Sequence, residues 1–181
     1  MVSVTRYRSP LGTMLLAADE IGLTGAWFEG QKYFGSTLTE ESREERSTVT
    51  DEAVRWLDLY FSGAVPDFLP PLHLTGSPFR REVWALLCAV PYGETVTYGE
   101  LAVRLRAKNG GRPVSARAVG GAVGHNPVSV IVPCHRVTGA GGRLTGYAGG
   151  LERKRQLLRR EQGLPFEPFN GGGSPGSISA P

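Results

Sequence analysis

The sequence predicts an α/β protein in which a small strand-containing N-terminal domain precedes a helical C-terminal domain. Three observations support this prediction. Short apolar stretches and turn residues fill positions 1–35, as expected for strands. Capping residues followed by apolar stripes at helical spacing dominate the chain after residue 77. A proline-rich connector at 66–71 lies between them, so we place the two domains at 1–71 and 72–163.

The N-terminal domain is expected to contain strands and one helix. Strands flank the Ser-Pro-Leu-Gly turn at 9–12, and a further apolar stretch runs from 23 to 28. Residues 36–48 are polar and are expected to form a loop. Thr50 is the expected N-cap of a helix that Gly63 ends, with acidic residues in its first turn. The expected apolar face of this helix consists of Ala53, Leu57 and Phe61.

Two capped helices are predicted at the start of the C-terminal domain. Ser77 is a favourable N-cap and Pro78 a favourable first helical residue, and the helix is expected to end before the Pro-Tyr-Gly break at 91–93. Thr97 and Glu100 then form the pattern of a capping box. The two apolar stripes comprise Phe79, Val83, Leu86, Leu87 and Val90, and then Leu101, Ala102 and Leu105.

A third short helix completes a pair that is typical of a helix-turn-helix. Ser115 is its expected cap, and Asn126-Pro127 ends it. The joining loop at 107–114 is longer than usual for that motif, so the helix pair alone does not establish DNA binding.

The chain then reaches a Pro-Cys-His-Arg segment at 133–136. The preceding apolar run, 128–132, is predicted to be a short buried strand. Many glycines follow, and a last helix is expected at about 151–162. The end of the chain is rich in Gly, Ser and Pro, so a disordered tail is expected at 164–181.

The charges are distributed unevenly along the chain. Residues 1–76 carry six Lys/Arg and eleven Asp/Glu, a net charge of −5. Residues 77–163 carry fourteen Lys/Arg and five Asp/Glu, a net charge of +9. A strongly basic half favours a polyanionic partner, although charge alone is equally compatible with a basic surface that has no partner.

The composition and the cysteines exclude several classes of protein. No apolar run approaches the ~20 residues of a membrane helix, and the N-terminus lacks the apolar core of a signal peptide. The two cysteines, Cys88 and Cys134, form neither a Cys-x-x-Cys pair nor a metal-spaced cluster. We therefore expect a cytoplasmic protein with reduced thiols, no metal and no cofactor, and we expect Cys88 in the core beside Leu87.

Cys134 is the candidate nucleophile. A cysteine reacts as its thiolate, and its pKa falls beside a base or cations. His135 and Arg136 follow Cys134 directly, but neighbours on an extended chain point to opposite faces, so adjacency does not bring their side chains together. A single cysteine without further context is more often a buried, unreactive residue.

Four segments together provide that context. They are Pro-Tyr-Gly-Glu-Thr-Val-Thr-Tyr at 91–98, Arg-Ala-Val-Gly-Gly-Ala at 117–122, Pro-Cys-His-Arg at 133–136 and Gly-Tyr-Ala-Gly-Gly at 146–150. With them the chain closely resembles the O6-alkylguanine-DNA alkyltransferases, also called methylated-DNA–protein-cysteine methyltransferases. The resemblance is strong over 77–163 and loose in the N-terminal half.

The resemblance implies a fold, an activity and a partner. The N-terminal domain would be ribonuclease H-like, and the C-terminal domain would carry a helix-turn-helix-like DNA-binding motif. The protein would act on double-stranded DNA and transfer the alkyl group of O6-alkylguanine to its own Cys134 in a single turnover. O4-alkylthymine is a further candidate substrate. The protein would be a monomer. It would need no cofactor, because the substrate itself carries the group to be transferred.

The resemblance also implies catalytic roles. Cys134 would accept the alkyl group, His135 would take its proton through a water molecule, and Glu161 would hold His135 by a hydrogen bond. This is the nucleophile, base and orienting group of a catalytic triad applied to a thiol. Tyr98 would donate toward guanine N3 as the base departs. Asn126 would hold the turn between the recognition helix and the segment that carries Cys134.

Further residues would contact the base and the DNA. The carbonyls of Cys134 and Val137 would accept from the guanine amino group, and the Ala148 N–H, beside Tyr147, would donate to O6. Arg117 would fill the gap that the flipped-out nucleotide leaves. The other residues expected to face the DNA are Thr97, Ser115, Ala118 and Gly121.

The resemblance places the helix at 115–124 in the minor groove, and its small residues fit that position. A minor groove is ~6 Å wide, whereas a helix with side chains is ~10–12 Å across, so only a helix with a small face can enter a widened groove. Close packing between helices would favour the same small residues. The flanking cations that could meet phosphates are Arg104, Arg106, Lys108 and Arg112.

Three other functions remain open at this point. A binding module of the same fold would recognise lesions without removing them, but it would lack the acceptor cysteine. A helix-turn-helix transcription factor would normally read the major groove and needs no reactive thiol. A cysteine hydrolase would turn over repeatedly, so stoichiometry would distinguish it.

Overall fold

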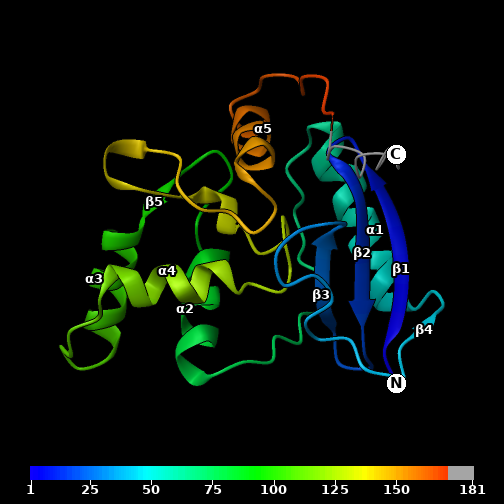
Figure 1. Ribbon diagram of the computed structural model, residues 1–181, viewed down its shortest axis with the longest axis horizontal. Helices are drawn as coiled ribbons and strands as arrows, with labels where there is room; N and C mark the ends of the chain where they lie inside the picture. Colours follow the sequence, from blue (N-terminus) through cyan, green and yellow to red (C-terminus); the bar gives the residue numbers. More distant parts are fainter. Residues whose placement is uncertain (171–181) are drawn as a thin grey trace, which may run out of the picture.

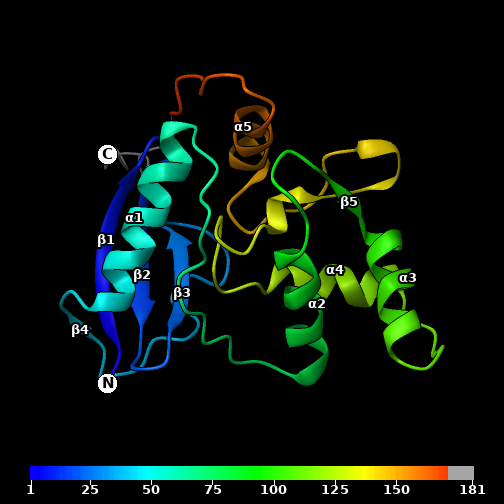
Figure 2. The same ribbon diagram turned by 180° about the vertical axis from the view of Figure 1, so that it is seen from behind.

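The N-terminal half is a four-stranded sheet with one helix packed on it. The computed structural model describes residues 1–170 of the chain. The elements are β1 (Ser3–Ser9), β2 (Gly12–Ala18), β3 (Leu23–Phe28), β4 (Arg43–Glu44) and α1 (Thr48–Ser62). The strand order is β3-β2-β1-β4, in which only β1 and β4 are parallel (Figure 1). Helix α1 covers one face of the sheet (Figure 2).

Strand β2 is covered on both faces. Met14 and Leu16 point into the main core with α1, whereas Leu15 and Ala17 pack in a smaller cluster on the other face. This alternation follows from the two-residue period of a strand. The turn before β2 ends at Gly12, whose φ of 110° is a conformation that favours glycine.

The N-cap of α1 is Ser47, not Thr50 as expected. Ser47 Oγ accepts a hydrogen bond from the Thr50 N–H (3.3 Å), and Thr50 Oγ1 accepts one from the Ser47 N–H (2.8 Å). Thr50 thus occupies the third position of a capping box, where Glu or Gln is usual, and this hid the true start of the helix. The segment expected to be a loop at 36–48 also contains β4. The expected apolar face of α1 is buried and Gly63 is its C-cap, so both predictions are confirmed.

The C-terminal half is mainly helical. Its elements are α2 (Pro78–Cys88), β5 (Val96–Thr97), α3 (Tyr98–Lys108), α4 (Ala116–Gly124), β6 (Val137–Thr138) and α5 (Leu151–Glu161). The caps expected at Ser77, Thr97 and Ser115 are confirmed, and so is the α/β fold class. The Trp84 Nε1–H donates to the Ala122 carbonyl (2.8 Å) and holds α4 against α2. Within residues 1–170, no helix is long and apolar enough to cross a membrane.

The apolar run before Cys134 is a buried turn, so the prediction of a strand is wrong. Val128 makes one isolated bridge to Ala26, and the φ of Val130 is 70°, which interrupts an extended chain. The Val132 N–H then donates to the Val128 carbonyl (3.1 Å), so the segment curls back on itself. An apolar run predicts burial correctly, but it gives no sign of a left-handed residue, which is rare for valine.

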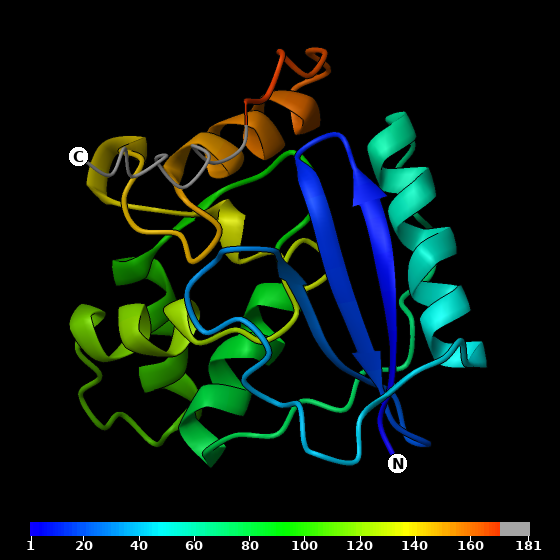
Figure 3. The ribbon, with the colours of Figure 1, turned by 45° about the vertical axis from the view of Figure 1, so that its right-hand side comes forward.

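The two halves are joined along β3, the edge of the sheet nearest the C-terminal half (Figure 3). The Ala26 N–H donates to the Pro127 carbonyl (2.9 Å), and the Ser129 N–H donates to the Ala26 carbonyl (2.8 Å). One buried apolar cluster contains residues from both halves. The turn that leads to Cys134 is therefore anchored on the N-terminal sheet.

The chain after α5 packs against the rest of the molecule as far as it is described. The rings of Phe166 and Phe61 lie 5.7 Å apart, and Glu167 forms ion pairs with Arg155 and with Arg159 (3.1 Å). The expected disordered tail therefore does not begin at residue 164. The remainder of that prediction, 171–181, lies outside the described residues.

Candidate active site

A cavity of about 210 Å³ lies between the two halves, with Cys134 in its wall. The C-terminal half of α4, the segment 146–148 and the loop after β3 form its other sides. The sequence-predicted residues that line it are Tyr98, Gly121, Cys134, Tyr147 and Ala148. Val137 is the one predicted base-contacting residue that is absent from this lining.

The Cys134 thiol is buried and begins a 3₁₀ turn, Cys134–Arg136. Burial raises the pKa of this thiol, while a hydrogen bond from Asn126 and the charge of Lys154 act in the opposite direction. The net pKa is above the ordinary value, so the thiol needs a base before it can act as a nucleophile.

His135 is a suitable base. Its Nε2 lies 2.6 Å from Glu161 Oε1, and both side chains are almost completely buried. Burial lowers the pKa of His135, so the ring is neutral near pH 7. A neutral ring that donates its Nε2–H to a carboxylate leaves Nδ1 as an acceptor. Within residues 1–170, Nδ1 is buried and has no hydrogen-bond partner.

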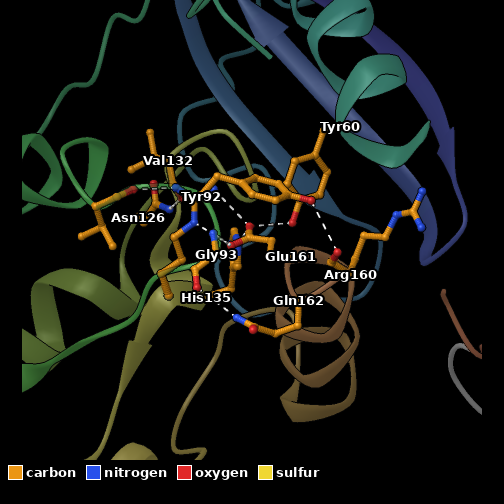
Figure 4. A network of polar contacts seen from close by, with 11 residues as sticks. Tyr60, Tyr92, Gly93, Asn126, Val132, His135, Arg160, Glu161 and Gln162 are labelled. Carbon is orange, nitrogen blue, oxygen red and sulfur yellow. Dashed lines mark hydrogen bonds and ion pairs between the residues drawn. The ribbon is translucent and has the colours of Figure 1, made fainter. Parts of the chain in front are cut away.

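Glu161 is the centre of a network of donors (Figure 4). Its Oε1 accepts from His135, from Tyr60 Oη (2.9 Å) and from Arg136 Nη2 (3.0 Å). Its Oε2 accepts from Arg136 Nε (2.9 Å) and from the Gly93 N–H (3.2 Å). Burial alone would raise the pKa of Glu161, but His135 and Arg136 lower it to about 2. The carboxylate is therefore ionised and can orient His135.

Asn126 closes the buried turn below Cys134. Its Nδ2 donates to the carbonyls of Val128 (3.2 Å) and Val132 (2.9 Å), and its Oδ1 accepts from the Val128 N–H (3.0 Å). The side chain thus pairs the buried Val128 N–H, and it gives a second donor to two carbonyls that also accept from the N–H groups of Val132 and Cys134.

Lys154 holds the loops around the cavity. Its buried Nζ donates to the carbonyls of Thr145 (2.7 Å) and Gly146 (3.1 Å), and also to that of Val137. Burial lowers the pKa of Lys154 to about 8. The Val137 carbonyl, which is expected to accept from guanine, already accepts from this ammonium group and keeps a second lone pair.

Helix α4 presents an exposed face of small residues. Ser115, Arg117, Ala118 and Gly121 are exposed, whereas the opposite face of the helix is buried. Thr97 is half-buried, and its hydroxyl oxygen caps α3 by accepting from the Glu100 N–H (3.1 Å). The exposed cations on α3 and on the loop before α4 are Arg104, Arg106, Lys108 and Arg112.

Two family descriptions together match almost the whole chain. The description "6-O-methylguanine DNA methyltransferase, ribonuclease-like domain" matches residues 2–74, and "6-O-methylguanine DNA methyltransferase, DNA binding domain" matches residues 78–163. The chain belongs to the 6-O-methylguanine DNA methyltransferase family.

Named relatives cover this family member almost from end to end. A methylated-DNA–protein-cysteine methyltransferase of Mycolicibacterium paratuberculosis is 44% identical over 164 residues, which are 90% of this chain and 93% of that protein. The protein of the same name from Methanosarcina acetivorans is 46% identical over 156 residues, 86% of this chain and 95% of that one.

A solved structure has the same fold. Mycobacterium tuberculosis OGT in complex with DNA superimposes with a TM-score of 0.78 at 40% identity and covers 90% of this chain and 95% of that chain. The 6-O-methylguanine DNA methyltransferase fold therefore extends over both halves of the present chain.

Sequence reasoning missed two residues of this methyltransferase site, Tyr60 and Lys154. Lys154 could have been found, because it shares a helix face with Leu157 and Glu161, and a lysine on a buried face needs partners. Tyr60 gave no signal beyond its place on an apolar helix face.

The prediction that Cys88 lies in the core is wrong. Its side chain is exposed at the end of α2, because it lies one step around the helix from the buried Leu87. Among residues 1–170, no group of three or more His, Cys, Asp or Glu side chains is placed to hold a metal ion.

Proposed function

We propose that this chain repairs alkylated DNA by moving the alkyl group from O6 of guanine to the Cys134 sulfur, once per molecule. The observation that supports it is a buried thiol in the wall of a cavity, next to a neutral His135 that Glu161 orients. The names of the relatives support the reaction, and the DNA in the Mycobacterium tuberculosis structure supports the partner.

The reaction is a displacement at the alkyl carbon. The Cys134 thiol gives its proton to His135 Nδ1 through a water molecule, and the sulfur attacks the carbon. The S–C bond forms as the C–O6 bond breaks, and the electron pair of that bond goes to guanine. Tyr98 donates its proton to guanine N3. The proton held by His135 then returns to Tyr98 through solvent. The net result is that the thiol proton goes to guanine and the alkyl group to sulfur.

The cavity has to receive a base that has left the duplex. O6 of a stacked guanine cannot reach a buried sulfur, so the nucleotide must be flipped out. The small exposed face of α4 suits a widened minor groove, and the exposed Arg117 at its start suits the gap in the stack. A reducing cytoplasmic compartment suits this chemistry, because the acceptor must remain a free thiol.

Intact mass measured after incubation with duplex DNA containing O6-methylguanine tests the proposal. We expect a gain of one methylene equivalent, mapped to Cys134 by peptide fragmentation, and we expect transfer to stop at one group per protein. Cys134→Ser should bind the DNA and transfer nothing. Cys88→Ser is the matched control, because it removes the other, exposed thiol, and it should react like the wild type.

Two results would contradict the proposal. A mass gain located on Cys88 would remove Cys134 from its assigned role. Several methyl groups released per protein would show repeated turnover, as expected of a cysteine hydrolase rather than of a stoichiometric acceptor.

A further inference from the structure

The Tyr60 hydroxyl links the N-terminal domain to the His135–Glu161 pair. Tyr60 lies on the inward face of α1 and is fully buried. Its Oη donates to Glu161 Oε1 at 2.9 Å across 101 positions of sequence. Figure 4 shows the Tyr60 side chain coming from α1 and Glu161 coming from the end of α5.

The Tyr60 ring is fixed on several sides. It stacks on Trp56 with ring centroids 5.3 Å apart, and it meets the Tyr92 ring edge-on at 6.0 Å. Its centroid also lies 6.3 Å from that of the His135 ring. Side chains packed in this way have little freedom to rotate, so ring contacts from both halves of the protein fix the position of the hydroxyl.

Tyr60 and His135 donate to the same oxygen atom. Glu161 Oε1 accepts from His135 Nε2 at 2.6 Å while it accepts from Tyr60 Oη. Each donor withdraws negative charge from the oxygen that the other uses. The Tyr60 hydroxyl therefore weakens the pull of Glu161 on the His135 ring, and it also fixes the orientation of the carboxylate.

We propose that Tyr60 is a positioning residue for alkyl transfer, which acts through Glu161 to set the basicity of His135. This inference rests on the proposed function. Among the described residues, Tyr60 is the one N-terminal side chain with a hydrogen bond to Glu161; the other donors are His135, Arg136 and the Gly93 backbone. The N-terminal domain thus supplies part of the proton-accepting apparatus although it lies outside the DNA-facing helices.

A purely structural role is the alternative, because a buried hydroxyl needs an acceptor wherever it lies. The two roles differ in their effect on His135: only a positioning role changes the pH at which this ring becomes protonated. The charged or titratable groups that face the pair are Arg136, Lys154, Tyr92 and Tyr147, together with Cys134 and Tyr60 itself. Removing only the Tyr60 hydroxyl leaves all the others in place, so any shift in the pH dependence can be assigned to that bond.

The test measures the single-turnover rate constant for transfer from free O6-benzylguanine as a function of pH, so that DNA binding does not enter. In Tyr60→Phe the carboxylate pulls harder on His135. We expect the acid limb of the profile, where His135 becomes protonated, to move up by roughly half a pH unit. Tyr60→3-fluorotyrosine, introduced at this position alone, makes the hydroxyl a stronger donor and keeps the packing. It should move the acid limb down, and it provides the test even if Tyr60→Phe folds poorly.

Tyr7→Phe is the matched control. Tyr7 is another tyrosine of the N-terminal domain that is largely buried, and its hydroxyl donates to a carboxylate, that of Asp58, at 2.9 Å, away from the cavity. Its pH profile should match that of the wild type. Opposite shifts in the two Tyr60 variants support the inference. Unchanged acid limbs in both variants, or the same shift in Tyr7→Phe, would overturn it. A wild-type protein that never becomes alkylated at Cys134 would instead overturn the proposed function.

Discussion

The Asn126 amide donates to the Val132 carbonyl at 2.9 Å, and this bond ties the end of α4 to the segment that carries Cys134. The same side chain makes two further hydrogen bonds with the backbone of Val128. The hydrogen bonds of this one side chain therefore hold a segment that lacks the backbone pairing of a strand. Through this side chain, the end of α4 is tied to the segment that carries the Cys134 thiol.

Asn126→Ala should destabilise the protein strongly. The substitution leaves the buried Val128 N–H without a partner, which costs about 1–3 kcal/mol. It also removes one of the two donors from each of the Val128 and Val132 carbonyls, and each lost hydrogen bond costs about 1 kcal/mol. We expect the free energy of unfolding in urea to fall by roughly 3 kcal/mol or more. Asn109→Ala, at the C-cap of α3, is the control and should change it by less than about 1 kcal/mol. If Asn126→Ala lowered the free energy of unfolding no more than the control does, water would have to satisfy the backbone groups of the turn.

Arg117→Ala should separate base flipping from chemistry. The Arg117 side chain is exposed at the start of α4 and is not part of the cavity wall. We expect the variant to repair duplex DNA much more slowly than the wild type and to react normally with free O6-benzylguanine. Arg8→Ala removes one exposed arginine from β1 and should affect neither rate. If Arg117→Ala slowed both reactions equally, the residue would serve the fold or the thiol.

The basic half should make DNA binding sensitive to salt. Arg104 and Lys108 are exposed and lie one helical turn apart on α3. Each phosphate neutralised on duplex DNA contributes about −0.9 to the slope of log affinity against log salt. Alanine at either position should make the slope shallower by about one. The control is Arg46→Ala, which removes a cation paired with Asp51 in the N-terminal domain. A slope that is the same in all three variants would exclude both α3 cations from phosphate contact.

The parts of the fold that the sequence predicts are those set by local chemistry. Ser77 with Pro78, and Thr97 with Glu100, cap helices through contacts within four residues, so their pattern is visible in the sequence. The turn at 128–132 is different, because its shape depends on one left-handed valine and on a distant strand. A run of β-branched residues predicts burial and extended chain, and only the burial is correct.

The candidate site is likewise divided between residues that the sequence predicts and residues that only contacts between distant elements bring in. The motif and the family resemblance predict Cys134, His135 and Glu161, and in the structure His135 Nε2 and Glu161 Oε1 lie 2.6 Å apart. Tyr60 and Lys154 act through contacts between elements that are distant in sequence or through carbonyl oxygens, which every residue has. The buried helix face predicts that Lys154 needs partners, but no residue type or spacing identifies which carbonyls they are, and nothing in the sequence pairs Tyr60 with Glu161.

The His135–Glu161 pair should make stability fall in acid. The pKa of His135 is lowered by burial from its ordinary value of 6.5, so the unfolded chain binds this proton more readily and stability declines as the pH drops below about 6.5. The pKa of Glu161 is lowered from 4.5 to about 2, so its contribution is present above pH 4.5 and is lost as the pH falls toward 2.

Urea unfolding at a series of pH values measures this dependence. Between pH 4.5 and 2 the free energy of unfolding should fall by on the order of 3 kcal/mol through Glu161. Glu161→Gln lacks the carboxylate charge, so the variant should be less stable than the wild type at pH 7. Because glutamine does not titrate, its free energy of unfolding should fall less between pH 4.5 and 2. Equal slopes for the variant and the wild type in that range would mean that other carboxylates account for the acid sensitivity.

Alkylation of Cys134 should destabilise the spent protein and loosen α4 first. The Cys134 side chain is only 5% exposed, so the new group must enter the cavity, whose wall includes Gly120, Val123 and Gly124 of α4. A methyl group replaces the S–H, which in the proposed reaction donates to the water leading to His135, and a lost hydrogen bond costs about 1 kcal/mol. A larger group also crowds the α4 wall, and overpacking costs roughly 1–3 kcal/mol more.

These energies predict a graded response to the size of the group. A loss of 1 kcal/mol lowers the melting temperature of a protein of this size by about 2–4 °C, and a benzyl adduct should lower it further. Hydrogen exchange should become faster in residues 116–124 before it does in α5, because α4 borders the cavity, whereas α5 lies outside the cavity wall and is held by the hydrogen bonds of Lys154 and Glu161. Unmodified protein, and protein alkylated at the exposed Cys88 alone, are the controls. If the methyl and benzyl adducts melted at the temperature of the free protein, the cavity would have to accommodate either group without moving α4.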